Sequence, residues 1–251
     1  MIRELVYGKQ ESWLWNPSAQ FCPGCHHPLA MKAILEVLDD MKLVDETISL
    51  WGVGCNAFGF MVTNLDAIST AHGRALDAAT GMKRALRGRP LVFAVMGDGD
   101  CLAIGAEALF NAAARAENVT GIMLNNSTYG MTGGQMAPTT VVGQVTTTTS
   151  QGRDPSATGY PLHAPEWLAP WTGVAYAARG AVNTPANFRK TKTYLKKAFE
   201  KQMEGAGFTF VEIIVDCVTN WHLTPLKSLE FIENTLLKEY PLGEFKGGTA
   251  R

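Results

Sequence analysis

Two hydrophobic patterns alternate along the 251 residues of this chain. Short, nearly continuous apolar runs predict strands that are covered on both faces, and longer stretches with apolar residues three or four apart predict helices. The predicted strands are 48–53, 67–70, 91–96, 121–124 and, as the last of the chain, 208–215; the predicted helices are 29–38, 75–86, 103–116 and 187–203. This alternation is typical of an α/β fold with a mostly parallel sheet and helices on both faces.

The length of the chain fits one large domain, which we expect to cover residues 1–251. Residues 16–28 are rich in Pro, Gly and Cys and predict a structured N-terminal loop. The polar segment 127–165 predicts a second and longer loop. Residues 218–251 follow the last predicted strand and form a C-terminal extension.

Charge and hydropathy exclude two classes of partner. The formal net charge is −1, so no basic field is available for nucleic acid. No apolar run reaches the roughly 18 to 20 residues that a membrane span needs. The N-terminus carries Glu4 and Glu11 among its apolar residues and has no signal-peptide core. We therefore expect a cytoplasmic protein, whose five cysteines are not a disulfide framework.

Residues capable of metal chemistry follow the predicted strands 91–96 and 121–124. Asp98 lies in the turn Gly-Asp-Gly-Asp, and Asn126 stands 28 positions later. One helical crossover between neighbouring parallel strands takes about 30 residues, so both side chains can reach one point above the sheet. Their oxygens suit Mg²⁺, which commonly takes phosphate oxygens as further ligands. Gly97 and Gly99 would let the backbone approach a diphosphate closely.

An ordinary strand-to-helix turn capped by Asp98 would also explain the Gly-Asp-Gly turn. The spacing to Asn126 and the two flanking strands favour the metal site instead. Residue chemistry alone leaves two roles possible for the segment His72-Gly73-Arg74. His72 and Arg74 could donate to a diphosphate, or the segment is a polar turn between a strand and a helix.

The Gly-Asp-Gly turn followed by the pair Asn125-Asn126 resembles the thiamine-diphosphate signature. Two further segments, 72–75 (His-Gly-Arg-Ala) and 128–135 (Thr-Tyr-Gly-Met-Thr-Gly-Gly-Gln), make the chain similar to the β subunit of 2-oxoacid:ferredoxin oxidoreductases. This resemblance covers nearly the whole chain, from Cys22 to Pro225. It implies a thiamine-diphosphate-binding, pyrophosphate-domain fold. It also implies the CoA-dependent oxidative decarboxylation of a 2-oxoacid to acyl-CoA and CO₂, with electrons passed to ferredoxin.

The same resemblance implies roles for particular residues. Asp98 and Asn126 would hold Mg²⁺ through their side chains, and Thr128 would hold it through its carbonyl. Further residues would contact thiamine diphosphate: Gly54, Asn56, His72, Gly73, Arg74, Gly99, Asp100, Gly130 and Met131.

The cysteines give a weak signal by spacing alone. Cys22 and Cys25 form a CxxC, whereas Cys55 and Cys217 stand apart, and a zinc ribbon would need a second CxxC. On spacing alone, the four cysteines could be buried packing residues, Zn²⁺ ligands or ligands of an iron–sulfur cluster. The resemblance implies that these four cysteines bind one 4Fe–4S cluster. We expect Cys101, the fifth, to be packed near the cofactor.

Thiamine enzymes usually need a glutamate to form the ylid, and neither Glu107 nor Glu166 has a matching sequence context. The resemblance implies that this glutamate lies on a separate α subunit, so the chain should be inactive alone. It also implies γ and ferredoxin-like δ subunits. The short chain and the segment 217–221 look more like the four-subunit members of this family that act on branched-chain 2-oxoacids or 2-oxoglutarate.

Two alternatives remain at this point. The chain could be half of a non-redox thiamine decarboxylase or synthase, with structural Zn²⁺ or free cysteines. It could also be a non-enzymatic α/β module for a Mg²⁺-nucleotide, although it has neither GxxxxGK[ST] nor GxGxxG after a strand.

Overall fold

A sheet of strands forms the centre of the computed structural model, which describes residues 12–13, 20–87 and 90–247. The seven strands within these residues are β1 (Thr47–Trp51), β2 (Asp66–Ser69), β3 (Leu91–Gly97), β4 (Thr120–Asn125), β5 (Val174–Ala181), β6 (Phe208–Ile214) and β7 (Gly243–Lys246). Their order in the sheet is β2-β1-β3-β4-β6-β5-β7. All neighbours are parallel except β5 and β7, which are antiparallel.

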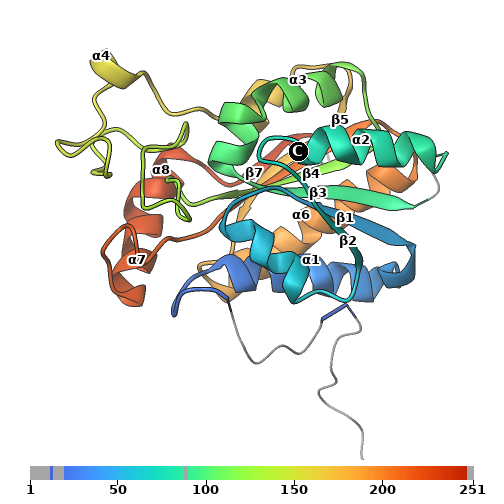
Figure 1. Ribbon diagram of the computed structural model, residues 1–251, viewed down its shortest axis with the longest axis horizontal. Coiled ribbons are helices and arrows are strands. Elements are labelled where there is room, and N and C mark those ends of the chain that lie inside the picture. Colours follow the sequence, from blue (N-terminus) through green and yellow to red (C-terminus); the bar gives the residue numbers. More distant parts are fainter. Residues whose placement is uncertain (1–11, 14–19, 88–89, 248–251) are drawn as a thin grey trace, which may run out of the picture.

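Helices cover both faces of this sheet (Figure 1). Their bounds are α1 (His27–Met41), α2 (Ala75–Ala85), α3 (Ala106–Ala114), α4 (Pro155–Thr158), α5 (Ala164–Leu168), α6 (Pro185–Met203), α7 (Pro225–Phe231) and α8 (Leu237–Glu239). α1 and α6 share a core with one face, and α2, α3 and α5 share a core with the other. In the described part of the chain, no helix is both long enough and apolar enough to cross a membrane.

The apolar character of β3 follows from its position between the two helical layers. Phe93 and Val95 pack toward α1 and α6, whereas Val92, Ala94 and Met96 pack toward α2 and α3. Successive side chains of a strand point to opposite faces, so a strand with a core on each side needs apolar residues throughout. The prediction of an α/β fold with a mostly parallel, doubly covered sheet is therefore confirmed.

Several boundaries differ from the sequence-based prediction. The predicted helix 103–116 begins as a π-helical turn over Asp100–Ile104, and only then continues as α3. The prediction that 208–215 is the last strand is wrong, because β7 follows it, and β5 was not predicted at all. Residues 16–19 of the predicted N-terminal loop, residues 248–251 of the C-terminal extension and the segment 1–11 lie outside the described residues.

β5 was not predicted from hydropathy because a buried charged residue interrupts its apolar sequence. Arg179 of β5 is fully buried, and its guanidinium binds two carboxylates. Its Nε lies 2.7 Å from Glu212 of β6, and its two terminal nitrogens each lie 2.7 Å from an oxygen of Glu166 in α5. Asn125, at the end of β4, donates to the other Glu212 oxygen at 2.6 Å. This group of residues therefore joins three strands and a helix through charge-assisted hydrogen bonds.

Arg179→Ala should destabilise the protein by about 3–5 kcal/mol, because it leaves the buried Glu212 carboxylate without its counter-charge. Urea denaturation followed by circular dichroism measures the loss. Arg189→Ala on the exposed side of α6 is the control and should change stability by no more than about 0.5 kcal/mol. Equal unfolding midpoints for the two variants would contradict the role of the buried ion pair.

Candidate functional site

Parallel pairing of β3 with β4 brings the predicted metal ligands to one edge of the sheet. Gly97 at the end of β3 pairs with Leu124 of β4, so the chain leaves both strands at the same level. Asp98, Asn126 and Thr128 consequently line one cavity of about 210 Å³ beyond the carboxyl ends of the strands. Ligands of open α/β sheets bind in this location.

Asp98 is a buried carboxylate, only 3% exposed. One of its oxygens accepts the N–H of Gly99 at 2.9 Å, and the other accepts the hydroxyl of Thr139. Burial is the main cause that raises the pKa of Asp98 to about 7, and the Glu212 carboxylate adds to it, while the hydrogen bonds from Thr139 and Gly99 act to lower it. A bound divalent cation would supply the positive charge that favours the ionised form of Asp98. The residue therefore fits the predicted role.

The loop after β4 is held so that Asn126 and Thr128 face the same cavity. Both residues are buried, and the amide oxygen of Asn126 accepts the N–H of Thr128 at 3.3 Å. Trp221 donates its indole N–H to the Asn126 carbonyl at 3.1 Å. Ser127 between them adopts a positive φ of 58°, a strained conformation that clusters at functional sites. The turn thus holds Asn126 and Thr128 in the wall of the cavity that Asp98 also lines.

Glycines shape the wall of the cavity next to Asp98. A Cβ on Gly99 would overlap the ring of Tyr129, so only glycine allows that ring to close over the turn. Gly54 has a φ of 151°, and a Cβ there would lie 2.7 Å from the amide oxygen of Asn56. The Asn56 amide nitrogen donates to the carbonyls of Gly52 and Val95, which leaves its buried oxygen without a partner.

A second buried acid, Asp100, stands on the other side of the turn. Its Oδ1 accepts the N–H of Gly73 at 2.5 Å and lies 2.8 Å from His72 Nδ1. Its Oδ2 is buried and has no partner. Unsatisfied buried acceptors are unfavourable, so Asp100 and Asn56 each fit a donor or hydrated cation supplied by a ligand. His72 lines the cavity, whereas Gly73 positions Asp100 from behind.

The structure does not bring Arg74 to the cavity. Its guanidinium binds Asp77 and Glu107, at 3.0 Å each, on the exposed surface of α2 and α3. Gly130 and Met131, in contrast, line the cavity, as their predicted contact with the cofactor requires.

The four cysteines outside the core line a second cavity of about 300 Å³. It adjoins the first, and five residues border both: His27, Cys55, Asn126, Gly130 and Met131. Gly130 lies in the wall between them. A Cβ on Gly130 would come within 3.1 Å of the Asn126 amide nitrogen, 3.2 Å of Cys55 Sγ and 3.5 Å of Cys217 Sγ. The predicted metal site and the thiols are thus separated by little more than this one residue.

The pKa of Cys25 is raised to about 12 and that of Cys55 to about 11, mainly by burial and to a smaller extent by the neighbouring thiols. A metal centre would supply the positive charge that thiolates need. Within the described ranges, no three His, Cys, Asp or Glu side chains gather as ligands of a single ion. In a tetrahedral zinc site the ligand sulfur atoms lie about 3.8 Å from one another. In a 4Fe–4S cluster each cysteine binds a different iron, so the sulfur atoms of the cysteines lie farther apart.

Cys101 lines neither cavity. It is fully buried in the core formed with α2 and α3, which confirms the prediction that it is a packed residue. Three residues around the site were missed: Thr139, Trp221 and Asn220. Asn220 donates to the Gly130 carbonyl at 2.8 Å and lies 3.3 Å from Cys217 Sγ. Trp221 and Asn220 follow Cys217 closely, a signal that could have found them, whereas Thr139 lies in a loop without a pattern.

Comparison with known proteins places this chain, like its geometry, among thiamine-diphosphate-binding domains. The family model for the thiamine pyrophosphate enzyme, C-terminal TPP binding domain, matches residues 52–213. The chain is 32% identical over 213 residues to the 2-oxoglutarate synthase subunit KorB of Archaeoglobus fulgidus, covering 85% of this chain and 75% of the relative. The chain belongs to the thiamine-diphosphate-binding subunits of the 2-oxoacid:ferredoxin oxidoreductase family.

Other members of the family add substrate classes and the fold. The ketoisovalerate oxidoreductase subunit VorA of Methanothermobacter marburgensis is 36% identical over 229 residues, covering 91% of this chain and 48% of the relative. The chain thus spans about half the length of that subunit. A 2-oxoglutarate:ferredoxin oxidoreductase from Magnetococcus marinus shares the fold, with a TM-score of 0.78 over 96% of this chain and 84% of that one, at 23% identity. The thiamine-diphosphate-binding fold is confirmed, and the alternative of a nucleotide-binding module is wrong.

Gly99→Ala should weaken Mg²⁺-dependent thiamine diphosphate binding by about tenfold or more, which corresponds to about 1.4 kcal/mol. The added methyl group would displace the Tyr129 ring or the turn that carries Asp98. Calorimetric titration of the cofactor measures the change. Gly81→Ala, on an open surface of α2, is the matched control and should keep wild-type affinity. Unchanged affinity in Gly99→Ala would show that the turn tolerates a side chain.

Proposed function

We propose that this chain is the β subunit of a 2-oxoacid:ferredoxin oxidoreductase and binds both Mg²⁺–thiamine diphosphate and one 4Fe–4S cluster. The observation that carries the proposal is the contact between the two cavities. Asn126, Cys55 and Gly130 border both, so the cavity proposed for diphosphate and metal shares a wall with the cavity of the four thiols. Electron transfer between bound thiamine and a cluster requires such closeness.

In this proposal Asp98 and Asn126 hold Mg²⁺ through their side chains, and Thr128 holds it through its carbonyl. Thiamine diphosphate, when bound, supplies an electron sink for the carbon that loses CO₂. The chain's own part is to bind and orient that cofactor. Its proposed contacts are Gly54, Asn56, His72, Gly99, Asp100, Gly130 and Met131, with Gly73 acting through Asp100.

Cys22, Cys25, Cys55 and Cys217 are the proposed cluster ligands. These four thiols would hold a cluster beside the wall at Gly130, and the cluster would supply one-electron redox chemistry there. The overall reaction would be CoA-dependent oxidative decarboxylation of a 2-oxoacid to acyl-CoA and CO₂, with ferredoxin as the electron acceptor. The names of the relatives favour a branched-chain 2-oxoacid or 2-oxoglutarate as the substrate.

The glutamate needed to form the ylid would come from a partner α subunit. No glutamate lines either cavity within the described residues. Glu107 is bound to Arg74 and Asn111, and Glu166 is bound to Arg179, so neither is available. Met131 borders both cavities and is 43% exposed, a surface that a partner would cover. Further γ and ferredoxin-like δ subunits are part of the proposed assembly.

The cluster assignment predicts a sharp division among the cysteines. Serine in place of Cys22, Cys25, Cys55 or Cys217 should bleach the visible absorbance and release iron. Cys101→Ser is the control and should keep both, because Cys101 packs in the core away from the cavity. Iron and sulfide analysis with absorbance spectroscopy measures the outcome. Zinc in place of iron and sulfide in the anaerobically purified wild type would instead favour a non-redox thiamine enzyme.

The partner requirement predicts that the isolated chain, with its cluster reconstituted anaerobically, will not reduce a viologen dye. The assay contains thiamine diphosphate, Mg²⁺, CoA and a panel of 2-oxoacids. The complex purified through a tag on this chain should reduce the dye, and the same complex with Asp98→Ala should not. Robust turnover by the chain alone would mean that its own residues include the catalytic base. An inactive wild-type complex with every 2-oxoacid would overturn the proposed function.

A further inference from the structure

The proposed metal-binding carboxylate of Asp98 is held by a residue that does not itself line the cavity. Thr139 is fully buried, and its hydroxyl donates to Oδ2 of Asp98 from 41 positions along the chain. The Gly99 N–H donates to Oδ1 from the turn itself. Asp98 therefore has one donor on each oxygen, and the two donors come from different segments. Together they fix the plane of the carboxylate.

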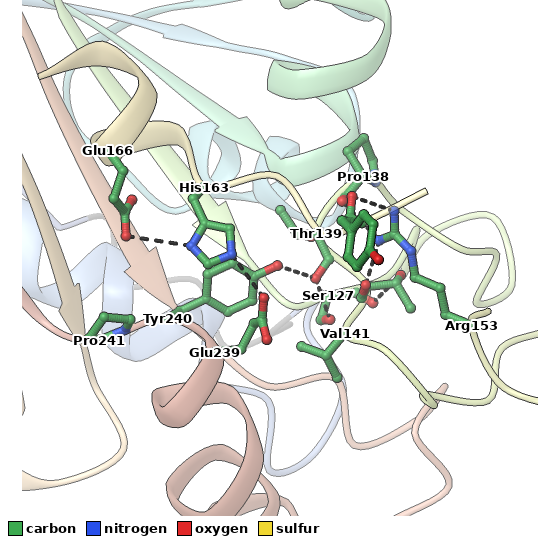
Figure 2. Close-up of polar contacts among 12 residues, drawn as sticks. Ser127, Pro138, Thr139, Val141, Arg153, His163, Glu166, Glu239, Tyr240 and Pro241 are labelled. Carbon is green, nitrogen blue, oxygen red and sulfur yellow. Dashed lines mark hydrogen bonds and ion pairs between the residues drawn. The ribbon is translucent and has the colours of Figure 1, made fainter. Parts of the chain in front are cut away.

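Thr139 is itself fixed through its backbone carbonyl, which accepts two hydroxyl groups (Figure 2). Ser127 donates from the loop that carries Asn126, with a distance of 3.0 Å between its Oγ and the carbonyl oxygen. Tyr240 donates from the segment after α8, with a distance of 2.5 Å from its phenol oxygen. The peptide at Thr139 thus connects the two proposed ligands of Mg²⁺ with the C-terminal part of the chain.

The Tyr240 ring is locked in its orientation. It is fully buried, its centroid lies 5.0 Å from that of His163, and the Arg179 guanidinium lies 5.2 Å from its centroid. His163 is in turn held by Glu239, with 2.9 Å between Nε2 and the nearer carboxylate oxygen (Figure 2). A ring packed on two sides leaves its hydroxyl few other directions. The Tyr240 hydroxyl is therefore a fixed donor to Thr139.

From this geometry we infer that Thr139 and Tyr240 are positioning residues for Asp98. Through these two residues, the segment after α8 holds the carboxylate of the Mg²⁺ site in its orientation. The inference rests on the proposed function of Asp98. Partners that hydrogen-bond to metal-binding carboxylates orient them, and losing such a partner typically costs 10–100-fold in metal affinity. The Tyr240 hydroxyl acts one step further away, through the Thr139 peptide.

The test measures Mg²⁺ binding by calorimetry at saturating thiamine diphosphate, in the complex purified through a tag on this chain. Thr139→Val keeps the shape of the side chain but removes the donor, and should weaken Mg²⁺ binding by about 10–100-fold. Thr139→Ser restores a hydroxyl and should restore the affinity. Tyr240→Phe should cause a smaller loss. Because both residues act along one path, the double variant Thr139→Val/Tyr240→Phe should bind no more weakly than Thr139→Val alone.

Two control variants separate positioning from loss of stability. Thr191→Val likewise removes the hydroxyl of a buried threonine, but this threonine lies in α6. Its hydroxyl donates to the carbonyl of Ala181 at 2.7 Å. Tyr176→Phe removes a phenol hydroxyl that donates to Glu244 at 2.8 Å. Both should keep wild-type Mg²⁺ affinity. Melting temperatures in excess EDTA, without cofactor, show how far each variant is destabilised.

Wild-type Mg²⁺ affinity in Thr139→Val would overturn the inference. So would an equal loss of Mg²⁺ affinity in Thr191→Val at the same melting temperature, because that pattern reports stability alone. Failure of the proposed function has a different signature. In that case the wild-type complex shows no Mg²⁺-dependent thiamine diphosphate binding, or Asp98→Ala binds the cofactor as tightly as the wild type does. Either result would overturn the inference as well.

Discussion

The parallel register of β3 against β4 is the constraint on which the site depends. Both strands are buried between two helical layers, so their apolar residues fix the pairing that sets Gly97 beside Leu124. A slip of one residue would turn each side chain to the wrong face. Because the pairing is fixed, Asp98 and Asn126 leave the sheet at one level, although 28 positions separate them. The carboxylate is buried there, and a cation bound at this edge would compensate its charge.

The long loop after β4 is ordered by polar contacts rather than by secondary structure. Arg153 is buried and donates to backbone carbonyls of the loop, including Pro138 at 3.0 Å and Thr140 (Figure 2). The carbonyl of Thr139, between these two, accepts Ser127 and Tyr240 instead. Such a loop keeps its shape without a ladder of strand hydrogen bonds. It can thus support one wall of the cavity that Asp98 lines.

The sequence alone predicted the parts of the structure that follow from local pattern. The buried strands, the crossover spacing and the Gly-Asp-Gly turn all fall under simple rules, and they located Asp98 and Asn126 correctly at one cavity. β5 was missed because Arg179 breaks its apolar pattern, and the Glu212 partner lies 33 positions away. Thr139 was missed for a similar reason, since only tertiary contacts link it to Asp98. Arg74 looked like a phosphate ligand by residue type, but Asp77 and Glu107 hold its guanidinium elsewhere.

The central claim is that Asp98 and Asn126 together hold a divalent cation at the edge of the sheet. Diffraction from crystals of the complex with thiamine diphosphate and Mn²⁺ in place of Mg²⁺, recorded at the manganese absorption edge, tests it most directly. The account predicts one anomalous peak within about 2.0–2.3 Å of side-chain oxygens of both residues, close to the distances of Mg²⁺ ligands. A bound cofactor whose manganese peak lies away from Asp98 and Asn126 would contradict the account.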